Sequence, residues 1–321
     1  MAAHDPTRRS FLSRAGALAL GGGVLWLGWR HLRWPEPTVA FQGGGASSGP
    51  IPLPRPGDRL LLLEGTVNGR TAPMLVDSGA QYTVVDRAFA EQVGLEPALA
   101  PPVVAWGLTG GPSVGRAARL DAEVGPMRLQ GLRAAVLDLS AVSAFGGRAF
   151  PVILGRDVLG AVTADLDFPR RRVVFHRPEA FVWPAAASTV AVRSGPAGLF
   201  AAVTVEGRGP VEALVDTGAS TALALSEATA RETGLLDGRR VRTAPSVSLG
   251  GISADRLVRA ERVGFAGRTF EDVTVQIYVP PSAPGVPQAL VGVGLLERFR
   301  VLLDVGAGRL GLIGATAGDA S

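Results

Sequence analysis

Cysteine and lysine are both missing from this chain of 321 residues, and histidine occurs only three times. Without cysteine, the protein can form no disulfide and offers no thiolate ligand to a metal. Only His176 lies beyond residue 40, so a histidine-based triad or a zinc site has too few ligands. We expect neither a metal nor a cofactor. We interpret His176, in an apolar run before Arg177-Pro178, as structural.

The basic residues are all arginine, and their balance with the acidic residues excludes some partners. The first forty residues hold five of the 32 arginines and two of the 28 acidic residues. Beyond residue 40, 27 arginines therefore face 26 acidic residues. A nearly neutral body argues against a nucleic-acid partner or an anionic membrane surface. We interpret the run Arg170-Arg171-Arg172 as a solvated hairpin turn.

The N-terminal forty residues resemble an export signal. Thr7–Leu12 is similar to the twin-arginine motif, and the apolar stretch Ala15–Trp29 is short for a membrane span but typical of a signal. Thr38-Val39-Ala40 offers small residues for cleavage. We expect a signal peptide over 1–40, a linker over 41–50, and a periplasmic or secreted protein. The alternative is a retained N-terminus that associates transiently with the membrane.

The remaining sequence is rich in turn-forming residues, with 43 glycines and 24 prolines in the whole chain. Short apolar runs between such residues predict strands and turns instead of a helix bundle. Helical spacing is clear only in Arg87–Val93 and Glu227–Thr233, with short helices expected at 157–159 and 295–299.

Two tripeptides mark an internal repeat: Asp77-Ser78-Gly79 and Asp216-Thr217-Gly218, each at the end of an apolar run. Their surroundings repeat at a nearly constant offset of 137–140 residues, as the following pairs show: Gly94-Leu95 with Gly234-Leu235, Ile153–Gly155 with Leu290–Gly292, and Asp167 with Asp304. A repeat this long indicates a duplicated domain, because solenoid repeats are far shorter. We predict an N-terminal lobe over 51–183, a C-terminal lobe over 184–314 and a tail over 315–321, with Asp167 and Asp304 forming turns.

These motifs resemble the aspartic peptidases of the pepsin and retroviral-protease superfamily. In that superfamily each lobe supplies one Asp-[Thr/Ser]-Gly, supported by an apolar-apolar-Gly signature such as Ile153–Gly155 or Leu290–Gly292. The chain is most similar to bacterial retropepsin-like proteins, with two copies fused. The resemblance implies an all-β, two-lobed acid-protease fold, and a monomer whose single chain completes the site. Pairing of lobes between two chains is the alternative.

The two aspartates carry the expected chemistry. Two carboxylates about 3 Å apart cannot both ionise, so Asp77 and Asp216 would share one proton, activate a water and hydrolyse a peptide bond in a polypeptide substrate. The resemblance implies that the hydroxyls of Ser78 and Thr217 bond across to the opposite loop. Gly79 and Gly218 allow backbone N–H groups to approach the carboxylates closely. The second hypothesis is a binding or scaffold protein that has kept the fold and lost catalysis.

A mobile hairpin, or flap, is expected over the substrate. Trp106–Gly111, which contains Leu108 and Gly110, is the candidate in the first lobe, with Leu249-Gly250-Gly251 as its partner. Trp106 or Leu108 would press on a substrate side chain. The alternative is a plain β-turn with a core tryptophan.

The chain departs from the pepsin pattern beside each aspartate. Ala80 and Ala219 stand where pepsin-type enzymes have a serine or threonine, and Val84 stands where they have a tryptophan. Fewer hydrogen bonds to an ionised pair leave its pKa values higher. We therefore predict a pH optimum of roughly 4.5–6.5.

Overall fold

The computed structural model describes residues 36–53, 60–100, 102–145, 149–195, 197–283 and 285–314. The expected signal segment before residue 36 and the expected tail over 315–321 lie outside these residues. The described chain consists mainly of strands, with five short α-helices. None of these helices is long and apolar enough to cross a membrane.

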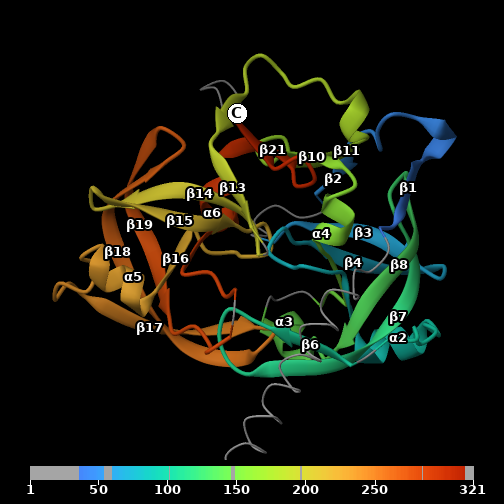
Figure 1. Cartoon of the computed structure of the whole chain (residues 1–321), viewed down its shortest axis with the longest axis horizontal. Helices are drawn as coiled ribbons and strands as arrows, with labels where there is room; N and C mark the ends of the chain where they lie inside the picture. Colours follow the sequence, from blue (N-terminus) through green and yellow to red (C-terminus); the bar gives the residue numbers. More distant parts are fainter. Residues whose placement is uncertain are drawn as a thin grey trace, which may run out of the picture. The chain divides into compact units, whose positions relative to one another are not determined.

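The first lobe is a closed β-barrel (Figure 1). Its strands follow the order β8-β5-β9-β4-β3-β7, and a further pairing of β7 with β8 closes the ring. The pairs β4–β9 and β5–β8 are parallel, and the others are antiparallel. The bounds are β3 (Leu62–Val67), β4 (Arg70–Val76), β5 (Val84–Asp86), β7 (Pro112–Val124), β8 (Met127–Leu137) and β9 (Val152–Leu154).

The second lobe repeats this barrel strand for strand. Its order is β14-β15-β20-β16-β19-β18, closed by pairing of β14 with β18, and its parallel pairs are β15–β20 and β16–β19. The bounds are β14 (Gly198–Val205), β15 (Arg208–Val215), β16 (Leu223–Ser226), β18 (Gly251–Phe265), β19 (Arg268–Tyr278) and β20 (Ala289–Val291). The predicted all-β, two-lobed acid-protease fold is therefore confirmed.

Each barrel carries additional edge strands. β6 (Val103–Trp106) pairs with β7, and its counterpart β17 (Val241–Ser248) pairs with β18. These two pairs form hairpins that extend to the bottom of the view in Figure 1. β13 (Val192–Gly195) lies beside β14.

A six-stranded sheet joins the lobes, in the order β12-β22-β21-β10-β11-β2. At its centre β10 and β21, one from each lobe, pair antiparallel, and the Arg300 guanidinium on β21 binds the buried Asp165 carboxylate on β10 at 2.6 and 2.8 Å. The lobes therefore share a continuous ladder of backbone hydrogen bonds. The bounds are β2 (Ile51–Pro52), β10 (Thr163–Asp167), β11 (Arg172–His176), β12 (Ser188–Val190), β21 (Phe299–Asp304) and β22 (Arg309–Gly314).

The two clearest predicted helices are present as α2 (Arg87–Gln92) and α5 (Glu227–Glu232). Each begins after a side-chain cap, since the Asp86 carboxylate and the Ser226 hydroxyl accept backbone N–H groups at 3.1 and 3.2 Å. α4 (Arg156–Leu159) and α6 (Val293–Leu296) follow the two apolar-apolar-Gly signatures. α3 (Ser140–Phe145) was not predicted.

Asp167 and Asp304 form turns, as predicted. Their buried carboxylates accept the N–H groups of Arg170 and Ala307 at 3.1 and 2.9 Å. The arginine run beside Asp167 is more than a solvated turn, because the half-exposed Arg170 and Arg172 side chains pair with that carboxylate at 3.4 and 3.3 Å.

Residues 38–48 differ from the expected end of a signal followed by a linker. β1 (Thr38–Phe41) pairs with β8 and buries the Phe41 ring. The Ser48 N–H then donates to the carbonyl of Phe175 at 2.9 Å, while the Ser48 hydroxyl accepts the Phe175 N–H at 3.0 Å. The many glycines here serve turns against the first lobe, so composition alone was a poor guide to this segment.

Candidate active site

The two Asp-[Ser/Thr]-Gly loops occupy equivalent places in the barrels. Asp77 follows β4, and its N–H donates to the carbonyl of Leu154 at the end of the parallel neighbour β9 at 3.0 Å. Asp216 follows β15, and its N–H donates to the carbonyl of Val291 on β20 at 2.9 Å. The apolar-apolar-Gly signatures thus supply the strands that hold the aspartate loops.

Four hydrogen bonds tie the two loops together. The Ser78 hydroxyl donates to the carbonyl of Val215 at 2.7 Å, and the Thr217 hydroxyl donates to the carbonyl of Val76 at 2.8 Å. In return, the N–H of Thr217 donates to the Ser78 hydroxyl and the N–H of Ser78 to the Thr217 hydroxyl, both at 3.0 Å. Both side chains are buried. The crossed bonds hold the two lobes in register at the candidate site.

The glycine of each tripeptide lies against the aspartate of the other lobe. A Cβ atom on Gly79 would stand 2.8 Å from the Asp216 carboxyl carbon, and a Cβ on Gly218 would collide with the Asp77 carboxyl group. The role predicted for these glycines is a close approach of their backbone N–H groups to the carboxylates. Their own N–H groups do donate to Asp77 and Asp216, both at 2.8 Å. The lack of a side chain is required by the opposite carboxyl group.

The carboxyl groups of Asp77 and Asp216 lie within hydrogen-bonding reach of each other. Burial raises the pKa of Asp77, against the lowering effect of backbone hydrogen bonds from Ala80 and Gly79. Burial and the neighbouring charge of Asp77 raise the pKa of Asp216 well above its ordinary value. The pair therefore holds one proton over a range of pH and titrates as a unit.

Arg156 contributes to this difference between the aspartates. It opens α4 directly after Gly155, and its positive charge lowers the pKa of Asp77. Burial lowers the pKa of Arg156 itself, and the charge of Asp77 opposes that effect. The repeat places Val293 at the corresponding position of the second lobe. Among the described residues, a cation thus acts on Asp77 and none acts on Asp216.

Comparison with protein families agrees with this geometry. The Aspartyl protease family profile matches residues 63–158, and the gag-polyprotein aspartyl protease profile matches residues 201–298. Each match contains one of the two tripeptides. The chain belongs to the retropepsin-like aspartic peptidases, in a form with two copies in one chain. Among curated proteins, none is similar enough in sequence to count as a relative.

The retropepsin-like site has an apolar wall in the second lobe that the sequence analysis did not single out. Leu214, two residues before Asp216, packs in a cluster with Tyr278 and Leu290. Leu108 of the first flap packs against the same cluster. The sequence does contain a signal for this wall, namely an apolar residue two positions before each aspartate. Alternate residues of a strand share a face, so this residue lies on the same face as the aspartate.

The two predicted flaps meet at their tips. Gly110 and Gly250 form a β-bridge, and the N–H of Gly111 donates to the carbonyl of Gly250 at 3.3 Å. A Cβ on either bridging glycine would collide with the backbone of the other flap. Leu249 takes part through its carbonyl, which accepts the Ser113 hydroxyl at 2.6 Å.

Hydroxyl groups, which were not predicted from the sequence, also connect the flap tips. Thr109 is only 3 % exposed. Its hydroxyl oxygen lies 3.3 Å from the Ser248 hydroxyl and 3.1 Å from the Ser253 hydroxyl. The Ser248 hydroxyl also donates to the carbonyl of Thr109 at 2.8 Å. Trp106 is 43 % exposed, so it is not a core tryptophan.

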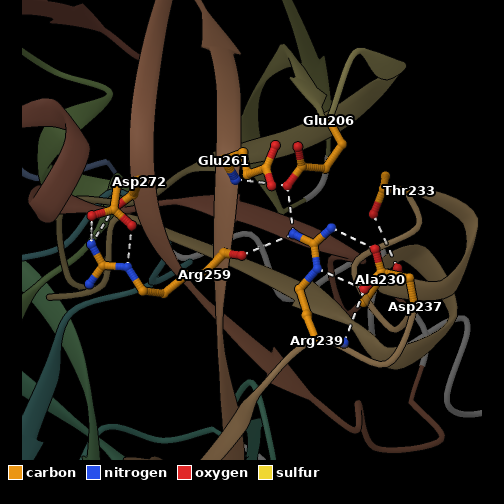
Figure 2. A network of polar contacts seen from close by, with 8 residues as sticks. All are labelled: Glu206, Ala230, Thr233, Asp237, Arg239, Arg259, Glu261 and Asp272. Carbon is orange, nitrogen blue, oxygen red and sulfur yellow. Dashed lines mark hydrogen bonds and ion pairs between the residues drawn. The ribbon is translucent and has the colours of Figure 1, made fainter.

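The second flap is also fixed at its base. Figure 2 shows Arg239, just before β17, bonded to the Glu206 carboxylate at 2.7 Å and to the Arg259 carbonyl on β18 at 3.0 Å. Asp237 binds the same guanidinium at 2.7 Å. These contacts fasten the segment entering the flap to the barrel.

Proposed function

We propose that this protein is an aspartic endopeptidase that hydrolyses peptide bonds with a water held between Asp77 and Asp216. The observation that carries the proposal is the pair of enclosed carboxyl groups, brought together from two lobes and held by crossed hydrogen bonds. The family to which the chain belongs supports the same reaction class.

The different surroundings of the two carboxyl groups assign their roles. Both carboxyl groups accept backbone N–H groups, but Arg156 acts on Asp77. Asp77 is therefore the ionised member and takes a proton from the water as the oxygen attacks the scissile carbonyl carbon. Asp216, protonated, donates a hydrogen bond to the carbonyl oxygen.

The tetrahedral intermediate then collapses. The leaving nitrogen receives a proton, the carbon–nitrogen bond breaks, and the two carboxyl groups again share one proton. Because both carboxyl groups have raised pKa values, activity is expected under mildly acidic conditions.

The substrate is a polypeptide, which binds under the two flaps. The protein acts as a monomer, because its single chain supplies both aspartates. The twin-arginine-like segment, which lies outside the described residues, supports export to the periplasm as part of the proposal.

The experiment compares cleavage of an unfolded protein at mildly acidic pH by the wild type, Asp77→Asn and Asp216→Asn. Loss of one acid-base group lowers the rate about 100-fold or more, and a pepstatin-type inhibitor should block the wild type. Asp121→Asn, which changes an exposed acid of the first lobe, is the matched control. Equal behaviour of the wild type and both dyad variants would favour an inactive binding or scaffold protein instead.

A further inference from the structure

A cavity of about 250 Å³ lies between the tip of the first flap and the second lobe. Thr109 and Gly110 line it from the first flap, Ser253 and Asp255 from the second, and Ile277 from β19. Its volume corresponds to that of about eight liquid water molecules. The cavity can therefore hold one long side chain.

Asp255 is the unusual group in this lining. Asp255 is only 5 % exposed. Its two carboxylate oxygens accept hydrogen bonds from the Ser253 hydroxyl at 3.1 Å and the Gln276 amide at 2.6 Å. Among the described residues, no ion pair to Asp255 is formed. A buried carboxylate without a countercharge is costly unless a ligand supplies the charge.

The other charges around the cavity do not compensate Asp255. Glu227 and Arg256 also line it, and they pair with each other at 2.8 Å. Arg231, on the exposed side of α5, contacts Glu227 as well. The lining therefore has one negative charge in excess. The charge of Asp255 also acts on the neighbouring Tyr278. Burial is the larger cause of the raised pKa of Tyr278, and the charge of Asp255 is the second cause.

Among the described residues of the first lobe, no acid stands at the position equivalent to Asp255, although the strands have the same register. Val136 comes directly after the partner of Val84 in the first lobe, and Gln276 comes directly after the partner of Leu223 in the second lobe. Val136 and Gln276 therefore occupy equivalent positions. Arg116 pairs with Val136 as Leu257 pairs with Gln276. Two residues before Arg116, the first lobe has Val114, which is 58 % exposed. Two residues before Leu257, the second lobe has the buried Asp255. The acidic cavity is thus a specific addition to the second lobe.

We propose that this cavity is a substrate subsite that binds the side chain of a lysine or arginine in the cleaved polypeptide. The inference rests on the proposed peptidase function. The cationic end would pair with Asp255, hydroxyls of Thr109 and Ser253 would accept further hydrogen bonds, and the aliphatic stem would pack on Ile277. Asp255 acts on the neighbouring Tyr278, which belongs to the apolar cluster that contains Leu214 near Asp216. A peptide at the catalytic pair can therefore reach the cavity.

A divalent cation fits this lining less well. Asp255 is the one carboxylate there that is not engaged by an arginine among the described residues, and calcium takes six to eight oxygen ligands. One ammonium or guanidinium group matches the excess of one charge.

The test first maps the cleavage sites in an unfolded protein. It then measures kcat/KM on sets of peptides that carry lysine, acetyl-lysine or methionine at a single position and are otherwise identical. The wild type should prefer lysine over acetyl-lysine at least 10-fold at one position. Asp255→Asn should lose this preference, so that the ratio of its kcat/KM values on the lysine and acetyl-lysine peptides falls at least 10-fold. Asp121→Asn should keep the preference.

The outcomes separate the two proposals. If the wild type cleaves peptides without preferring lysine at any position, or if Asp255→Asn retains the preference, the subsite is overturned and the peptidase stands. If the wild type cleaves nothing, the peptidase proposal fails and the subsite with it. Should Asp255→Asn fail to fold, the comparison of lysine with acetyl-lysine in the wild type decides alone.

Discussion

At the scale of single residues, the site is built from contacts that cross between lobes. Gly79 is constrained by the carboxyl group of Asp216, and Ser78 by the backbone at Val215. Each tripeptide thus completes the surroundings of the other aspartate. Changes of one atom at these positions should therefore affect the distant carboxyl group more than the local backbone.

Gly79→Ala should abolish most activity. The new Cβ would stand 2.8 Å from the Asp216 carboxyl carbon, and overpacking of this kind costs roughly 1–3 kcal/mol of stability. A displacement of about 1 Å at a reacting group lowers the rate on the order of 100-fold. Peptide cleavage and chemical denaturation measure the two effects. Gly45→Ala, where the nearest atom is 3.6 Å away, should change neither, and an active Gly79→Ala would contradict the geometry.

Arg156→Met should move the acid limb of the pH profile to higher pH. Without the nearby cation the pKa of Asp77 rises, and the acid limb of kcat/KM reports the base of the free enzyme. At pH 4 the loss should be several-fold, with plateau activity within about twofold of the wild type. Arg156→Lys keeps the charge and should retain the original limb. A limb unchanged in Arg156→Met would remove Arg156 from the assignment of roles.

At the scale of elements, the two flaps differ in construction. The first is a short hairpin of four paired positions between β6 and β7, whereas β17 and β18 pair over eight positions. Arg239 additionally fastens the base of the second flap. The first flap therefore has fewer contacts of its own and depends on the hydroxyl contacts at its tip.

Thr109→Val should loosen the closed flaps. The change keeps the shape of the side chain but removes the hydroxyl that contacts Ser248 and Ser253, and each lost hydrogen bond is worth roughly 0.5–1.5 kcal/mol. Amide exchange at the flap tips should rise about 10-fold, measured by mass spectrometry. Thr189→Val on the exposed edge of β12 is the control. Unchanged exchange in Thr109→Val would show that the backbone bridge alone holds the tips.

At the scale of the whole molecule, partly buried carboxyl groups link folding to pH. Burial raises the pKa values of Asp77, Asp157 and Asp216, so the folded state binds their protons more tightly than the unfolded chain. Their stabilising contribution is present at low pH and is lost as the pH rises through the folded-state values. The protein should therefore tolerate mild acid better than its neutral composition suggests.

Asp157 allows a quantitative prediction, because burial raises its pKa from 3.8 to about 6. The free energy of unfolding should fall by about 2 kcal/mol between pH 4 and 7 on account of this group. Asp157→Asn should remove that part of the decline in urea titrations. Asp138→Asn should not, since a hydrogen bond from the Ser140 side chain lowers the pKa of Asp138. Stability that rises from pH 4 to 6 in the wild type would refute the prediction.

The fold was predictable because its main signals are local and occur twice. Asp77 and Asp216 end apolar runs, Gly155 and Gly292 end apolar signatures, and a constant offset relates the copies. Residues 38–48 were misjudged because β1 depends on pairing with β8, about ninety positions away in the chain. Thr109, Ser248 and Ser253 escaped notice because isolated hydroxyl residues carry no periodic signal.

The amino-acid sequence by itself determined that the chain forms two similar β-barrels and that each presents one aspartate, because duplication repeats local patterns. The tertiary structure alone decided where the copies differ. The position of Arg156 beside Asp77, the hydroxyl contacts between the flap tips and the uncompensated charge of Asp255 are asymmetric. They arise where single residues from distant segments meet in space, and electrostatic and hydrogen-bonding effects depend on those distances.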